Sequence, residues 1–309
     1  MYALDIDKLV VDYGKFKTDM SLKIRRGCVT GLVGRNGAGK STLIKAIMRQ
    51  IDAVSGKILY DGKPFRGNET EIFGRVACVF DAPHFNIYSK PSKIFKMFKS
   101  VYRQFDEELY RRLMNKFSLP DNLRFIRFSY GMQRKYCLIL ALCQKPDLLI
   151  LDEPTSGVDP LDRSAVVELI QEFMMDEKHT VIFSTHMTED LDKIADYIVV
   201  LENGRVILDE DKVSITENYR LVQTSELTDE LRAEAIGVQK SMFGYTFLTK
   251  NRQLGGKNLQ IKTPTVEELF VHLLREGSPN GLNPLNGEVG GSVYGGHDIV
   301  DNGEDIFKL

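Results

Sequence analysis

The stretch GRNGAGKST, Gly34 to Thr42, decides the fold of this chain. It follows an apolar strand-like run, CVTGLVG (28–34), and leads into a helical pattern, LIKAIM (43–48). This order fits GxxxxGK[ST], a loop whose glycines allow backbone N–H groups to wrap a phosphate chain. In such a loop Lys40 reaches the outer phosphates, Ser41 offers its hydroxyl to Mg²⁺, and the helix N-terminus adds partial positive charge. Because the glycines run GxxGxG and not GxGxxG, the stretch predicts a nucleotide phosphate site and not a dinucleotide fingerprint.

A second apolar run ends in two acids, LLILDEP at 148–154. Its four apolar residues predict a buried strand, so Asp152 stands at the carboxyl end, where it can hold Mg²⁺ through the hydration shell of the ion. Glu153 follows directly and can orient or deprotonate an attacking water. Two acids before a proline turn are often structural by themselves. Together with the phosphate loop they predict a hydrolytic site.

Two further residues are candidates for the same site. His186 follows another buried run, TVIFST (180–185), which we expect to lie beside the strand of Asp152, so that the imidazole can bond to a γ-phosphate and to water. Tyr13, in VDYGKF, either packs locally or stacks on adenine. The remaining histidines are expected to be ordinary surface or core residues: His84, His179, His272 and His297.

The composition limits the class of protein. The 309 residues are 43% hydrophobic and 27% charged, with a formal net charge of −2, which predicts a globular chain without a nucleic-acid partner. The four cysteines form no CxxC pair, which argues against zinc and against a disulfide framework. Early acids argue against a secretory signal, and no run of about 18 apolar residues occurs.

Strand-like and helical patterns alternate, which predicts an α/β fold with a largely parallel sheet. Met20, Leu22 and Ile24 alternate with polar residues, as in a half-exposed antiparallel strand. We expect three parts, of which the last is disordered because its Gly- and Asn-rich sequence cannot bury enough apolar surface. They are an ATPase core at 1–212 with a helical insertion at about 88–145, a small α+β part at 213–276, and a tail at 277–309.

The helical insertion is basic, and its pattern places Ile94, Phe98, Val101 and Phe105 on one helical face. A basic helical surface is commonly just a solvated face. It can also dock on a membrane-embedded partner or on anionic lipids. The sequence leaves both interpretations open.

The stretch FSYGMQRKY, Phe128 to Tyr136, places Ser129 and Gly131 before a predicted helix without an acid, base or nucleophile beside them. Phosphate loop, FSYGMQ, ILDEPTSGVDP and STH follow one another in this order. In order and spacing these motifs closely resemble the ATP-binding subunit of ABC transporters, over about residues 2–210. In that family two subunits pair head to tail, and the signature motif of one closes over ATP held by the other.

The resemblance implies a role for each motif. Ser129 and Gly131 would bind the γ-phosphate of the nucleotide on the partner subunit, and Val158 and Asp159 would belong to the loop that couples the two sites. Tyr13 would be the aromatic residue that stacks on adenine. The residues around the phosphates of ATP–Mg²⁺ would be Gly34, Asn36, Gly37, Gly39, Lys40, Ser41 and Thr42.

The sequence departs from the commonest pattern of the family at two motifs. Tyr130 and Met132 stand where Gly and Gln are most usual, a form similar to ABC-2-type exporter and antibiotic-resistance subunits, which often carry a C-terminal appendage. Asp81, in VACVFDAPHF, stands where a Gln usually follows the strand. Its carboxylate can still reach Mg²⁺ directly or through water, although it cannot donate an amide hydrogen bond.

We therefore expect an ATP-hydrolysing subunit that powers a separate transmembrane permease, of the exporter type. It would act with a second identical or related ATP-binding subunit, in the cytoplasm on the inner face of the membrane. The alternative is an ABC-type ATPase acting on DNA or ribosomes, but the long coiled coil or second cassette of those classes is not seen. A GTPase would need an NKxD motif, and NKFS at 115–118 lacks the Asp. The transported substrate cannot be inferred, because the membrane chain recognises it.

Overall fold

The computed structural model describes residues 1–256 and 259–276, and the tail for which we predict disorder lies outside them. A six-stranded sheet, here called the core sheet, has the order β10-β9-β3-β8-β7-β6. All of its neighbouring strands are parallel except β10, which is antiparallel to β9. The predicted α/β fold with a largely parallel sheet is thus confirmed. The strands are β3 (Val29–Gly34), β6 (Val76–Val79), β7 (Leu148–Asp152), β8 (Thr180–Thr185), β9 (Tyr197–Glu202) and β10 (Arg205–Asp211).

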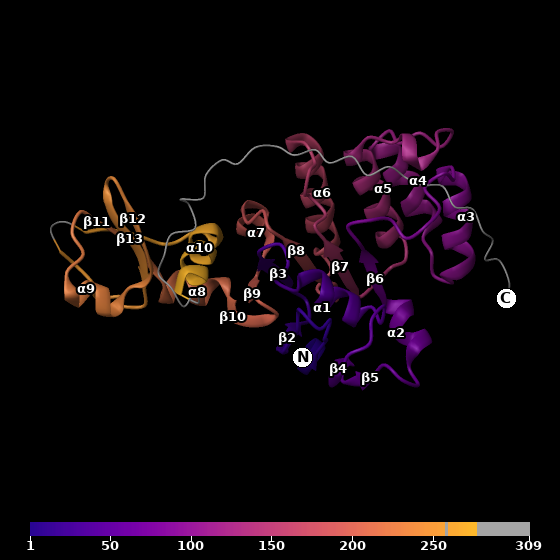
Figure 1. Ribbon diagram of the computed structural model, residues 1–309. Helices are drawn as coiled ribbons and strands as arrows, with labels where there is room; N and C mark the ends of the chain where they lie inside the picture. Colours follow the sequence, from indigo (N-terminus) through magenta and orange to yellow (C-terminus); the bar gives the residue numbers. More distant parts are fainter. Residues whose placement is uncertain (257–258, 277–309) are drawn as a thin grey trace, which may run out of the picture.

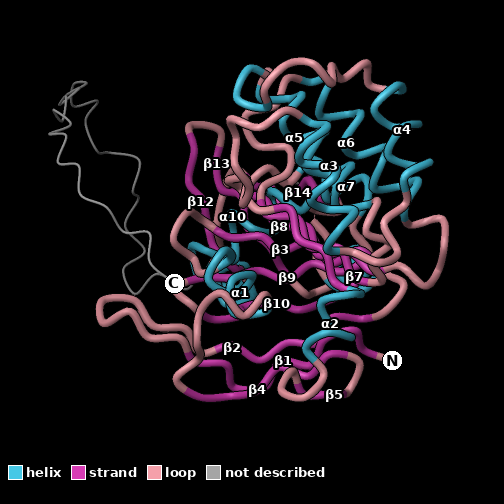
Figure 2. The backbone as a smooth tube through the Cα atoms, turned by 90° about the vertical axis from the view of Figure 1, so that its right-hand side faces the viewer, coloured by secondary structure: helices cyan, strands magenta, loops and turns pink. Residues whose placement is uncertain are grey.

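A four-stranded antiparallel sheet covers one side of the core sheet and helix α1 (Figure 2). Its order is β2-β1-β4-β5, and β2 carries the alternation of Met20, Leu22 and Ile24 that predicts an antiparallel strand. The strands are β1 (Tyr2–Val10), β2 (Met20–Arg25), β4 (Ser55–Tyr60) and β5 (Lys63–Pro64).

Helices α3 to α7 cover the opposite side of the core sheet, whereas α1 and α2 lie on the side of the antiparallel sheet (Figure 2). The first helices are α1 (Lys40–Ile47), α2 (Glu69–Arg75), α3 (Pro91–Val101), α4 (Glu107–Lys116) and α5 (Tyr130–Leu142), with a 3₁₀ turn at Phe125–Arg127. The later ones are α6 (Pro160–Phe173), α7 (Glu189–Ile194), α8 (Lys212–Asn218), α9 (Asp229–Glu234) and α10 (Val266–Glu276). Within the described parts of the chain, no helix combines the length and the hydropathy that a membrane crossing requires.

The central strands β3, β7 and β8 are buried on both faces, which explains why they are continuous apolar runs. In β7, Leu149 and Leu151 belong to the hydrophobic cluster under the helices, whereas Leu148 and Ile150 belong to the cluster under the antiparallel sheet. The strand therefore ends between two apolar layers. This fixes the position of Asp152, its last residue.

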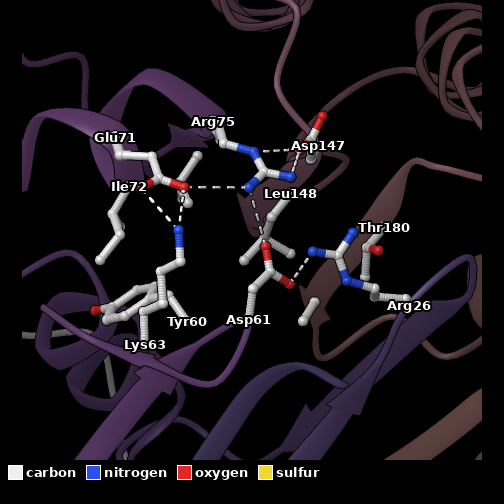
Figure 3. A pocket seen from close by; sticks show the side chains of 12 residues that line it. Arg26, Tyr60, Asp61, Lys63, Glu71, Ile72, Arg75, Asp147, Leu148 and Thr180 are labelled. Carbon is white, nitrogen blue, oxygen red and sulfur yellow. Dashed lines mark hydrogen bonds and ion pairs between the residues drawn. The ribbon is translucent and has the colours of Figure 1, made fainter. Parts of the chain in front are cut away.

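Charged side chains join the antiparallel sheet to the core sheet (Figure 3). Asp61, in the turn between β4 and β5, pairs with Arg26 after β2 and with Arg75 at the end of α2, the latter at 3.4 Å. Arg75 in turn pairs with Asp147, just before β7. These side chains are partly exposed, so the network contributes little to stability beyond fixing how the layers meet.

One expected helix is shorter than its pattern predicts. The apolar spacing from Ile94 to Phe105 predicts one helix that includes both residues. The structure differs, because α3 ends at Val101 and Phe105 lies in the segment before α4. Phe105 still packs against Phe95, with ring centroids 5.7 Å apart. The periodicity gave the right core residue but the wrong helix end, because the chain turns back at 102–106 to begin α4.

A second four-stranded antiparallel sheet, order β12-β13-β11-β14, lies at the end of the molecule away from α3–α5 (Figure 1). Helix α10 packs on β12 and contacts α7 and β9. Its predicted capping box is present, since Thr265 N–H donates to Glu268 Oε2 at 2.9 Å and Glu268 N–H donates to Thr265 Oγ1 at 3.2 Å. The division near residue 212 stays a prediction. The strands are β11 (Arg220–Thr224), β12 (Ile236–Ser241), β13 (Gly244–Thr249) and β14 (Leu259–Lys262).

Candidate functional site

The phosphate loop joins the buried end of β3 to α1. A Cβ on Gly34 would lie 2.8 Å from the carbonyl oxygen of Leu201 and 2.9 Å from Ala38 Cβ, so only glycine fits there. Gly39 has a φ of 110°, in the region that favours glycine. Two of the predicted glycines are thus fixed by backbone geometry, and the loop presents the N-terminus of α1 at the carboxyl edge of the sheet.

Lys40, Glu153 and His186 form one chain of contacts. Lys40 Nζ, whose side chain is 6% exposed, donates to the carbonyl oxygen of Gly34 at 2.7 Å and lies 3.5 Å from Glu153 Oε1. The other carboxylate oxygen of Glu153 lies 2.7 Å from His186 Nδ1, a hydrogen bond in which the protonated ring nitrogen donates. Three residues proposed from separate motifs therefore meet at one point, with the glutamate between two nitrogen donors.

The backbone at Glu153 is unusual. Its φ of 51° is in the left-handed region, which is uncommon for a residue with a side chain. Its N–H donates to the carbonyl oxygen of Ser184 on β8 at 3.0 Å, which holds this conformation. The turn directs the Glu153 carboxylate toward Lys40 and His186, whereas Asp152 stays in the strand. Strained backbone of this kind concentrates at functional sites.

Asp152 is a buried carboxylate at the end of β7. Ser184 Oγ donates to its Oδ1 at 3.1 Å. Burial raises the pKa of Asp152, an effect that hydrogen bonding from Ser41 and Ser184 partly offsets. Since Ser41 and Asp152 come together and both supply oxygen, the ligand atom that Mg²⁺ prefers, these residues fit the predicted ion.

The other predicted residues lie outside this group of contacts. Ser129 caps its own helix, with Oγ accepting from Met132 N–H at 3.2 Å, and Gly131 packs against Asp162 of α6. Both belong to the start of α5, in the upper part of Figure 1, whereas α1 lies in the lower part. Tyr13 is 54% exposed in the segment between β1 and β2. Asp81 pairs with Arg134 of α5.

Sequence analysis missed Ser184 and Arg134, which contact predicted residues. Ser184 is the buried donor to Asp152, and a hydroxyl inside the run TVIFST gave no signal of its own. Arg134 is buried against Asp81 although it belongs to the basic stretch around α5, where cations are expected on the surface. The roles of all these residues stay predictions.

Comparisons with known proteins agree with the geometry. A family model described as ABC transporter matches residues 17–156. The chain is 30% identical to the lantibiotic transport ATP-binding protein SrtF of Streptococcus pyogenes, over 67% of this chain and 90% of that protein. It is 27% identical to the bacitracin transport ATP-binding protein BcrA of Bacillus licheniformis, over 96% of this chain and 89% of that protein.

A solved structure of an ATP-binding subunit of an ABC transporter superposes with a TM-score of 0.61 at 27% identity, covering 69% of this chain and 91% of that one. The fold and site define a phosphate-loop ATPase. The chain belongs to the family of ABC transporter ATP-binding proteins, which bind ATP and hydrolyse it to drive transport. The family prediction is confirmed, and the alternative of a DNA- or ribosome-directed ATPase is not favoured.

Proposed function

We propose that this chain is the ATP-hydrolysing subunit of an exporter and powers a separate transmembrane permease. The observation that carries the proposal is the contact chain Lys40–Glu153–His186 at the end of a phosphate loop. The exporter type is supported by BcrA, because that similarity extends over 96% of this chain, beyond the core sheet. The location on the inner face of the membrane follows from the permease partner.

The site residues would act as follows. Lys40, with backbone N–H groups of the phosphate loop, binds the outer phosphates of ATP. Glu153 takes a proton from the attacking water, and its position between Lys40 and His186 orients the carboxylate for this role. His186 hydrogen-bonds to the γ-phosphate and to the attacking water. Ser41 and Asp152 would hold Mg²⁺, which supplies charge neutralisation for the phosphates when bound.

A second ATP-binding subunit would complete the site. Ser129 is exposed at the N-terminus of the 13-residue helix α5, and it accepts hydrogen bonds from the N–H groups of Met132 and Gln133 of that helix. Backbone N–H groups at such a start favour an anion. We propose that this anion is the γ-phosphate of ATP on the partner subunit, which makes two identical or related chains necessary.

The permease would dock in an apolar groove between α2, β6 and α3. The groove has a volume of about 1020 Å³, and its wall includes Phe73, Met97, Val101 and Tyr102. Phe73, Met97 and Val101 are exposed apolar side chains from two elements that face one space. An apolar groove with a charged rim suits a helix of a membrane protein that ends in the aqueous phase.

Two matched valines test the docking surface. Val101 and Val213 are both 66% exposed, but only Val101 lines the groove. We expect Val101→Glu to abolish co-purification with the permease, taken as the membrane protein that the tagged wild-type chain retains, and to abolish stimulation of ATP hydrolysis by it. Val213→Glu should leave both unchanged. Equal losses in the two variants, or none in Val101→Glu, would place the permease elsewhere.

A further inference from the structure

Arg134 is a buried cation with partners on two elements. Its side chain is 5% exposed, and Nη1 donates to the carbonyl oxygen of Phe80, just after β6, at 3.1 Å. Nη2 contacts both the carboxylate of Asp81 and the hydroxyl of Tyr130. Arg134 thus ties the end of β6 to the first turn of α5. We call Asp81, Tyr130 and Arg134 the latch.

Asp81 compensates the positive charge of Arg134. A buried guanidinium is costly without a counter-charge. In the described part of the chain, Asp81 is the only carboxylate that pairs with Arg134, and Arg134 Nε makes no hydrogen bond there. A neutral amide at position 81 could accept a hydrogen bond but would leave the cation uncompensated. The acid in place of the usual Gln therefore has a partner other than a metal.

The latch also reaches the loop that precedes α6. The guanidinium carbon of Arg134 lies 4.8 Å from the centre of the Tyr130 ring, and this stacking holds the ring in place. A Cβ built on Gly157 would lie 3.4 Å from Tyr130 Cε1, so the ring rests against that glycine. Phe80, whose carbonyl oxygen accepts a hydrogen bond from Arg134, lines the apolar groove. One buried cation therefore connects the groove, the start of α5 and the loop before α6.

We propose that Arg134 is a positioning residue that fixes the start of α5 relative to the groove, and that Asp81 serves Arg134 as its counter-charge and not Mg²⁺ as a ligand. Two of the departures from the commonest family pattern, at positions 81 and 130, thereby act as one unit. The consequence for turnover rests on the proposed function. The pairing itself does not.

The test is a double-mutant cycle with Asp81→Asn and Arg134→Gln in the full chain. Arg134→Gln should lower the midpoint of thermal unfolding by about 5 °C, and Asp81→Asn, whose carboxylate is 68% exposed, by about 2 °C. The double variant should fall no lower than the worse single. The control cycle uses Asp7→Asn and Lys57→Gln, an exposed pair 3.5 Å apart, for which small and additive shifts are expected. Additive shifts at the latch would overturn the pairing, whether or not the protein hydrolyses ATP.

Kinetics separate positioning from metal binding and from simple destabilisation. Well below the unfolding midpoint, each single variant should lose about tenfold in kcat, with KM for ATP and the Mg²⁺ concentration for half-maximal rate within about twofold of wild type. Asp81→Glu, which keeps the charge, should retain most of the rate. The proposal fails if Asp81→Asn raises the Mg²⁺ requirement tenfold while Arg134→Gln leaves it unchanged, or if kcat is unaffected by either change.

Discussion

Helices α1 and α5 both begin with a turn suited to an anion, yet their surroundings differ. The start of α1 has a buried ammonium, a carboxylate between two nitrogen donors, and a second carboxylate with a raised pKa. The start of α5 has an exposed serine that caps the helix and a glycine packed against Asp162. The first contains the groups for chemistry, and the second contains only groups for binding.

The proposed function accounts for why one chain has two such turns. A hydrolytic site must limit bulk solvent and hold a base, and Lys40, Asp152 and Glu153 are buried or largely so. A turn that closes on another subunit, as we propose for the start of α5, must remain at the surface until that subunit arrives. Substitutions at the two helix starts should therefore fail in different ways, and that difference can be measured.

The largest expected effect is at the α1 site. Glu153→Gln keeps the shape of the side chain but loses the base, so turnover should fall by about 10²–10⁴ while ATP binding persists. Steady-state ATP hydrolysis and calorimetric titration with ATP measure the two quantities. The variant should also accumulate as an ATP-bound dimer on size exclusion. Normal hydrolysis by Glu153→Gln would show that Glu153 has only a structural role.

The next effect should separate the two helix starts. Ser129→Arg places a long side chain at the surface of α5, so hydrolysis should fall at least tenfold while the isolated subunit still binds ATP. Lys40→Ala should instead weaken ATP binding about 10–100-fold, because a charge-assisted contact to phosphate is lost. Calorimetry on each variant distinguishes the two outcomes.

Mixing these two variants sharpens the comparison. One mixed dimer site combines the intact Lys40 of one chain with the intact Ser129 of the other, and the second site carries both lesions. At an ATP concentration well below the Kd of the Lys40→Ala subunit, the mixture should therefore hydrolyse ATP faster than either variant alone. Loss of ATP binding in Ser129→Arg by itself would mean that the start of α5 serves its own chain.

The sequence predicted the α1 site well because its parts are local. The loop Gly34–Thr42 and the strand before Asp152 are each complete within a few residues, and parallel neighbours bring strand ends to one edge. The order of β7 and β8 then places His186 beside Glu153. The strained turn at Glu153 and the buried hydroxyl of Ser184 had no sequence signal, since the first is an ordinary acid and the second stands inside an apolar run.

The surroundings of α5 could not be predicted in the same way. Asp81 and Arg134 are 53 positions apart and belong to different elements, so nothing local pairs them. Arg134 stands among many cations, and only the packing of α5 beside β6 shows that it is buried, as its neighbour Lys135 is. The contact of Gly131 could not be predicted either. Its motif suggested a ligand, whereas the structure shows that Asp162 of α6 packs against it.

The smallest expected effect concerns Gly131, for which two explanations compete. A Cβ at this position would lie 1.8 Å from Asp162 Oδ2, so Gly131→Ala must displace a carboxylate that pairs with the largely buried Lys135 at 2.7 Å. The unfolding midpoint should fall by about 3–6 °C. Gly74→Ala is the matched control, because a Cβ on this glycine of α2 meets nothing within 4 Å and alanine favours a helix.

The double variant Gly131→Ala with Asp162→Ala separates packing from ligand approach. Removing the carboxylate makes room for the new methyl group. The unfolding midpoint of the double variant should therefore fall by less than the sum of the two single losses. Hydrolysis should stay low, because the methyl group still stands where the phosphate of the partner's nucleotide approaches the backbone. Recovery of both stability and hydrolysis would show that Gly131 is required only by its contact with α6, and that the start of α5 binds its ligand without it.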